Sequence, residues 1–146
     1  MKHLLYVLLL LTSIACAKAP VPTKPSNIQR SGVPVSVSSV QIDLVGNHIV
    51  RAIQHNMEIN PVVQFEIMSR PTFTVLNTLT INEISHNGEI LSLKNATGAF
   101  VESITFNEDN INILFDYFYP KGGSVLLSCT LAIKDDNFAP LSCNKK

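Results

Sequence analysis

The sequence predicts a mainly β domain, a small antiparallel β-sandwich with one short helix, held behind an export signal and a proline-rich tether. Two observations predict this class. Apolar residues recur at every second position over most of the chain after Gly32, which is the period of half-buried strands. Clusters of Gly, Pro, Asn and Asp separate these runs, as turns between short strands do. We therefore assign residues 1–15 to a signal peptide, 16–32 to a tether and 33–146 to the sandwich.

The composition excludes two classes of protein. Of the 146 residues, 46% are hydrophobic and 15% are charged, which is too apolar for a disordered chain. The 11 basic residues are matched by 11 acidic ones, so no basic footprint points to a nucleic-acid partner.

The N-terminus has the pattern of an export signal. Met1-Lys2-His3 is a short, positively charged start, and Leu4 to Leu11 is an unbroken apolar run. The apolar stretch is shorter than the roughly 20 residues that a membrane span needs.

The end of this signal, Ser13-Ile14-Ala15-Cys16, resembles the lipobox of bacterial lipoproteins, with Ser13 where that family usually has leucine. The resemblance implies that Cys16 is lipidated and becomes the mature N-terminus. The protein would then be anchored in the bacterial cell envelope, at the outer membrane facing the periplasm. The alternative is cleavage by signal peptidase I after Ala17, which would release a secreted protein.

The cysteine count predicts one disulfide. The chain has three cysteines, and Cys16 is either lipidated or removed with the signal. In both cases Cys129 and Cys143 remain, and in an oxidising compartment they can pair. A bridge closing this loop of about 15 residues would contribute on the order of 3 kcal/mol.

The segment from Ala17 to Gly32 reads as an extended spacer. It contains three prolines and three basic residues and has no hydrophobic periodicity. At about 3.1 Å per residue it could reach roughly 50 Å from an anchor. It either lies along anionic lipid head groups or is a solvated linker.

The strands are read from the period-two pattern. The first apolar set changes phase at Ser38-Ser39, which predicts a β-bulge that keeps the set on one face. This set comprises Val35, Val37, Val40, Ile42 and Leu44. A second strand covers Val62 to Met68 and ends before Arg70-Pro71, because proline cannot donate a ladder hydrogen bond. A third strand is marked by Phe73, Val75, Leu79 and Ile81.

Two hairpins complete this pattern. Asn87-Gly88 lies between apolar flanks within Ile84 to Ile90, a strong signal for a tight hairpin turn. The last hairpin turns at Pro120 to Gly123 and should direct Cys129 into the core. Its two apolar faces comprise Ile111, Ile113, Phe115, Tyr117 and Tyr119, and Val125, Leu127, Cys129, Leu131 and Ile133.

One region favours a helix. Ile49, Val50, Ile53 and Met57 follow helical spacing, with Asn47 as a possible N-cap and Pro61 beyond the end. We therefore expect one short helix over Asn47 to Met57 among six to eight strands.

No motif for catalysis or metal binding stands out. His48 and His55 are seven apart and would share a helix face, but no third ligand is near, so we expect two exposed histidines and no metal. His86 lies in a hairpin turn, where a solvent-facing side chain is expected. The acidic clusters at 107–110 and 135–137 could offer oxygen ligands to calcium, or be polar turns. We assign no catalytic residue, no metal ligand and no cofactor.

The stretch Pro61 to Ile67, with Phe73 beyond it, is similar to the early strand region of the small β-sandwich lipoproteins of type VI secretion. This resemblance is consistent with a sandwich fold, and we transfer no residue's role from it.

These observations lead to a functional hypothesis. We expect an envelope-anchored, non-enzymatic lipoprotein that acts as a protein-interaction or assembly module, with the membrane and an unidentified protein as partners. The alternative is a small ligand-binding or inhibitor protein exported to the periplasm or cell surface. An envelope hydrolase would need one of the histidines packed against a carboxylate and a nucleophile.

Overall fold

The computed structural model describes Pro34 and residues 36–146. The predicted signal peptide, Cys16 and the tether, together with Val35, lie outside the described residues. Within the described part, two antiparallel sheets and a separate hairpin surround a common core, so the predicted β-sandwich class is confirmed. No helix of this part is long and apolar enough to cross a membrane.

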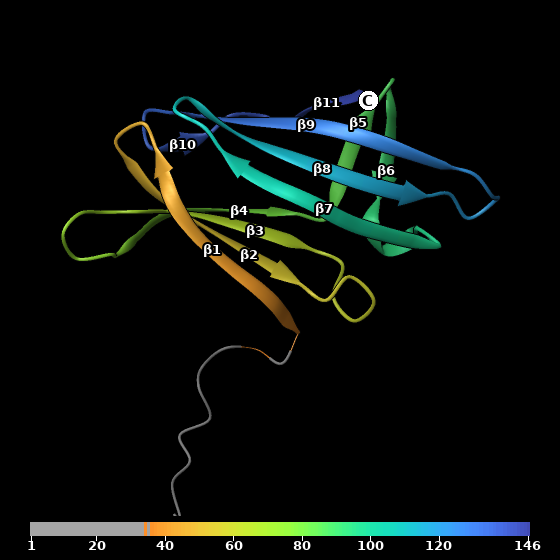
Figure 1. The fold of residues 1–146 in the computed structure, drawn as a ribbon, viewed down its shortest axis with the longest axis horizontal. Helices are drawn as coiled ribbons and strands as arrows, with labels where there is room; N and C mark the ends of the chain where they lie inside the picture. Colours follow the sequence, from red (N-terminus) through yellow and green to blue (C-terminus); the bar gives the residue numbers. More distant parts are fainter. Residues whose placement is uncertain (1–33, 35) are drawn as a thin grey trace, which may run out of the picture. The chain divides into compact units, whose positions relative to one another are not determined.

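The first sheet is a meander in which each strand pairs with the next along the chain (Figure 1). Its strands are β1 (Val37–Val45), β2 (His48–His55), β3 (Val63–Met68) and β4 (Val75–Ile81). The register shifts between Val37 and Ser39, which confirms the predicted bulge. β4 begins at Val75, so the prediction that Phe73 belongs to this strand is wrong, and Phe73 lies in the preceding loop.

The second sheet has β8 and β9 at its centre. Its strands are β7 (Gly98–Phe106), β8 (Asn110–Phe118), β9 (Ser124–Lys134), β10 (Asn137–Phe138) and β11 (Ser142–Lys145). β8 pairs with one side of β9, and β10 and β11 follow one another along its other side. The C-terminal residues thus cover an edge of β9 that would otherwise be open.

The disulfide between Cys129 and Cys143 is present, as predicted. The two residues are register partners on β9 and β11, so the bridge fixes β11 against β9. Cys129 is fully buried, which agrees with its predicted inward phase.

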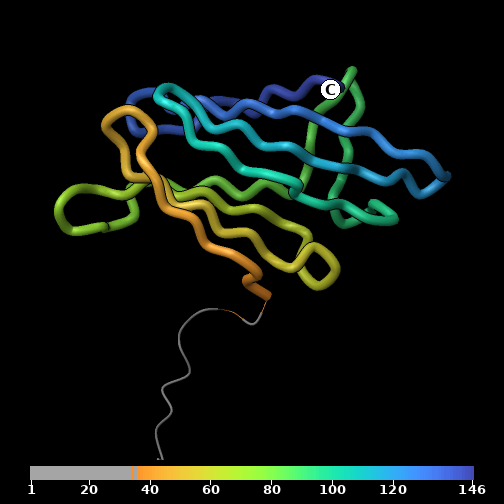
Figure 2. Tube along the Cα trace, in the orientation of Figure 1, coloured from red at the N-terminus to blue at the C-terminus, as the bar shows by residue number. Residues whose placement is uncertain are grey.

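A third unit, the hairpin of β5 (Glu83–His86) and β6 (Glu89–Ser92), runs across the direction of the sheet strands (Figure 2). Its turn is the predicted Asn87-Gly88 pair, and both residues have positive φ, as a tight hairpin turn requires. A short 3-10 turn, η1 (Leu93–Asn95), follows. Ile84, Leu91 and Leu93 from this region are buried in the common core.

The core confirms the predicted last hairpin. Side chains from both sheets are fully buried between them, among them Phe65 of β3 and Phe115 of β8. The buried members from β8 and β9 are Ile111, Ile113, Phe115, Tyr117, Val125, Leu127, Cys129 and Leu131.

The predicted helix over Asn47 to Met57 is wrong, because residues 48–55 form strand β2. Val45 pairs with His48, so Gly46 and Asn47 form a two-residue turn with glycine first, at φ +58°. This turn directs the chain back along β1. The β-branched residues of this segment fit a strand that pairs on both sides with β1 and β3, and these long-range pairs override the helical spacing.

Candidate functional site

The clearest feature of the surface is a row of aliphatic side chains on β1. Val40, Ile42 and Leu44 are 49%, 58% and 48% exposed, although they lie in the middle of a regular strand. We call these three residues the outer β1 face. They share the side of the first sheet that faces away from the core, whereas the neighbouring Val45 is buried.

The bulge keeps the row on one face of β1. It aligns Val37 with Val40 on one face, as the sequence predicted, but Val45 has the opposite phase and is the one residue of β1 that joins the buried core cluster. The period-two pattern alone could not assign the row to one side of the sheet.

β1 is also an edge strand, since β2 is its only partner among the described strands. Asp43 lies between Ile42 and Leu44, and its carboxylate accepts a hydrogen bond from the backbone N–H of Leu44 at 2.8 Å. A charged residue on an edge strand disfavours pairing with another chain. The side chains of β1 are therefore better placed for contact than its backbone edge.

Two hollows flank the middle of this face. One, of about 530 Å³, is lined by Ile42, Leu44 and Ile49 together with Arg70 and Phe73 from the β3–β4 loop. The other, of about 370 Å³, is lined by Val37, Val40, Arg51, Ile53, His55, Gln64 and Pro34. The exposed side chains of the outer β1 face therefore border two hollows, one beside Ile42 and Leu44 and the other beside Val40.

Phe73 is held at the rim of the larger hollow. It has φ +55°, in the left-handed region that costs a non-glycine residue roughly 1–2 kcal/mol, and it is 61% exposed. The loop fixes it through backbone hydrogen bonds from Phe73 N–H to the Ser69 carbonyl at 3.0 Å and from Ser69 N–H to the Thr74 carbonyl at 2.9 Å. An exposed aromatic ring in a strained, well-bonded loop is typical of binding surfaces.

A salt bridge lies beside the outer β1 face. Arg51, the cross-strand neighbour of Ile42, donates from Nε to Glu66 Oε2 at 2.6 Å, and its Nη2 contacts the same oxygen. Gln64 Nε2 donates to the other carboxylate oxygen at 2.7 Å. Glu66 is only 7% exposed, and each of its carboxylate oxygens accepts a hydrogen bond from a protein side chain, as a buried carboxylate requires.

The three histidines considered in the sequence are separated in the structure. His48 and His55 lie at opposite ends of β2 and, being an odd number of residues apart on a strand, on opposite faces. The expected shared helix face is therefore wrong. Among the described residues, no group of three or more His, Cys, Asp and Glu side chains could hold a metal ion.

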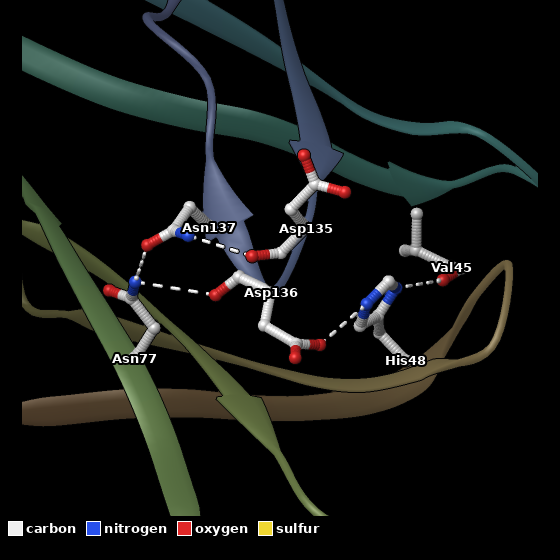
Figure 3. Close-up of polar contacts among 6 residues, drawn as sticks. All are labelled: Val45, His48, Asn77, Asp135, Asp136 and Asn137. Atoms are coloured by element: carbon white, nitrogen blue, oxygen red, sulfur yellow. Dashed lines mark hydrogen bonds and ion pairs between the residues drawn. The ribbon is translucent and has the colours of Figure 1, made fainter.

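His48 has a structural partner, shown in Figure 3. Its Nε2 lies 2.9 Å from Asp136 Oδ1, and its Nδ1 lies 3.3 Å from the Val45 carbonyl. Asn77 Nδ2 donates to the Asp136 carbonyl at 3.3 Å and to Asn137 Oδ1 at 2.7 Å. These bonds tie the β9–β10 turn to the first sheet.

His55 is buried, contrary to the expectation of an exposed side chain. Its Nδ1 lies 2.9 Å from Ser36 Oγ and 3.2 Å from Asn60 Nδ2. Ser36 and Asn60 both contact Nδ1 of His55, so they hold the imidazole ring in place where β2 ends and the β2–β3 loop begins. His86 is partly buried in its hairpin, and its Nδ1 has no hydrogen-bond partner among the described residues.

The acidic clusters form tight turns. Asp135 and Asp136 both have positive φ and join β9 to β10. Asn107 and Asn110 close the β7–β8 turn through a backbone bond of 2.8 Å and a side-chain bond of 2.9 Å. The polar-turn interpretation accounts for both clusters.

The aromatic residues of β8 are mainly core. Phe115 and Tyr117 are buried, and the Tyr117 ring packs edge-on against Tyr119 with centroids 5.2 Å apart. The Tyr117 hydroxyl donates to the Ser92 carbonyl at 3.2 Å. Burial raises the pKa of this phenol, and Tyr119 and Glu89 raise it further, so the neutral donor is favoured.

Comparison with known protein families, with characterised proteins and with solved structures finds no match for this chain.

Proposed function

We propose that this protein is an envelope-anchored, non-enzymatic lipoprotein whose β-sandwich binds a protein partner through the outer β1 face. The observation that carries the proposal is the half-exposed row of Val40, Ile42 and Leu44. Contiguous exposed apolar side chains, rimmed by polar ones, are typical of interaction sites on soluble domains. Burying the rest of each side chain would contribute about 1 kcal/mol.

The two sheets differ in a way that favours this surface. One row of register partners on the outer side of the second sheet, Thr105, Asn112 and Thr130, is polar, and Thr130 Oγ1 donates to Asn112 Oδ1 at 3.1 Å. The exposed rings of Phe100 and Phe118 on the same side stack edge-to-face against each other. The first sheet instead presents aliphatic residues between two apolar hollows. A partner with complementary apolar side chains would therefore select the first sheet.

The binding prediction compares Ile42→Asp with Thr105→Asp. Both positions are exposed on edge strands, so the second variant is a matched control. A photo-crosslinking residue placed at position 42 of the full-length chain in membranes should yield a protein adduct, and one at position 105 should not. Against the partner so identified, Ile42→Asp should weaken binding by about tenfold or more, because it places a charge in an apolar contact.

Thermal unfolding of both variants serves as the folding control. Equal adducts from positions 42 and 105, or unchanged affinity for Ile42→Asp, would contradict the proposed surface.

The anchoring prediction concerns Cys16 and follows from its lipobox-like context. Wild-type protein should sediment with membranes, and Cys16→Ala should shift to the soluble fraction, because acyl chains contribute about 0.8 kcal/mol per buried methylene. Intact mass of the wild type should show the added lipid. The same distribution for wild type and variant would mean that Cys16 carries no anchor.

A further inference from the structure

A cavity of about 570 Å³ shares no lining residue with the outer β1 face. One wall is the loop of residues 56–62 between β2 and β3, and the other is the segment 93–100, from η1 into β7. The volume falls within the range of small-molecule sites, which run from about 300 to 1,000 Å³.

Apolar side chains stand among the polar groups that line the cavity. Leu93 and Ala99 line it and are buried members of the core. Ile59 from one wall and Phe100 from the other are 70% and 45% exposed. Folding leaves both of these side chains largely in water, so a ligand between them would bury apolar surface.

Both walls are fixed by hydrogen bonds. In the first, Asn56 N–H donates to the Ser36 carbonyl at 2.6 Å, and Asn60 N–H donates to the Asn56 carbonyl at 2.8 Å. In the second, Thr97 N–H donates to the Phe118 carbonyl at 3.0 Å. A cavity with walls held in this way is formed before a ligand arrives, which reduces the entropy lost on binding.

Glycine at position 98 leaves room for the Phe100 ring on the second wall. A Cβ added there would lie 3.1 Å from Phe100 Cε2 and 3.7 Å from Phe118 Cδ2. The two rings stack edge-to-face with centroids 5.9 Å apart. The absence of a side chain at Gly98 therefore lets the Phe100 ring lie against the wall.

The cavity also carries one charge of each sign. Glu58 lies on the first wall and Lys94 on the second, and neither forms an ion pair with another of the described residues. A carboxylate accepts hydrogen bonds from an ammonium group, and a lysine ammonium donates to a carboxylate.

We propose that this cavity binds a small apolar zwitterion, namely a free amino acid or a short peptide with an aliphatic or aromatic side chain. The ligand's ammonium meets Glu58, its carboxylate meets Lys94, and its side chain packs over Leu93 and Ala99 between Ile59 and Phe100. The proposal uses a surface separate from the outer β1 face and goes beyond the proposed function, so either can fail without the other.

The test is an NMR titration of the detergent-solubilised full-length chain with three probes. L-leucine carries both charges, N-acetyl-leucine lacks the ammonium and leucinamide lacks the carboxylate. L-leucine should perturb backbone resonances of both walls, saturating in the millimolar range. Glu58→Gln and Lys94→Met should each weaken its binding by about twofold to fivefold, the range for exposed ion pairs.

The probes and variants together distinguish charge recognition from general apolar binding. N-acetyl-leucine should be insensitive to Glu58→Gln, and leucinamide should be insensitive to Lys94→Met. Glu102→Gln, at an exposed acid of β7 that does not line the cavity, should leave all three affinities unchanged. The proposal is overturned if L-leucine causes no saturable change at the walls, or if the three probes bind equally and the cavity variants have no effect.

Discussion

Loss of the Cys129–Cys143 disulfide should lower the free energy of unfolding by about 3 kcal/mol. The two cysteines are 14 residues apart in the sequence, so reduction frees a loop of that size in the unfolded chain. The folded state should also lose order locally, because the bridge holds β11 along β9. Urea unfolding with and without reductant measures the difference.

The double variant Cys129→Ala/Cys143→Ala is the matched control. It should unfold at the lower midpoint in both conditions, and amide exchange should accelerate at Lys146, whose N–H donates to the Leu126 carbonyl at 3.0 Å. An unchanged midpoint on verified reduction would show that β11 is held by its backbone pairing alone.

Arg51→Met should destabilise the domain by about 2–3 kcal/mol. The substitution leaves the buried Glu66 carboxylate with Gln64 as its remaining hydrogen-bond partner. Breaking a fully buried ion pair costs about 3–5 kcal/mol, and we expect less here because the Arg51 side chain is 33% exposed. Denaturant unfolding at neutral pH gives the value.

The double variant Arg51→Met/Glu66→Leu tests the cause of that loss. Removing both charges should recover most of the stability, since no buried charge is then left without a partner. A double variant as unstable as the sum of the two single variants would show that Arg51 acts through the packing of its aliphatic stem and not through Glu66.

The two hairpins, the bulge and the disulfide were predictable from local sequence. Asn87-Gly88 adopts positive φ at both positions because its own backbone chemistry favours that turn. The last hairpin was predicted because its alternation extends over two long strands with one buried face. The pairing of Cys129 with Cys143 followed from parity and from the inward phase of Cys129.

The strands β7, β10 and β11 were not predictable from local pattern, and β2 was wrongly predicted as a helix. β10 and β11 are short, so they carry too few residues for a period to be recognised, and β9 and the disulfide determine their place. β2 places Val50 and Ala52 in the core and Ile49 and Ile53 beside the outer β1 face, so apolar residues fall on both of its faces and alternation is lost. The burial of His55 and the contact of His48 with Asp136, 88 residues away, also depend on distant segments.

The sequence by itself therefore determined the β class, most of the strands and the disulfide, because these follow from local periodicity, turn chemistry and cysteine parity. Only the tertiary structure decided that Val40, Ile42 and Leu44 face solvent and that Glu58 and Lys94 share a cavity. Alternation along a strand separates two faces but does not say which one meets the other sheet. That choice depends on which distant strands complete the core, and here they leave the apolar side of β1 uncovered.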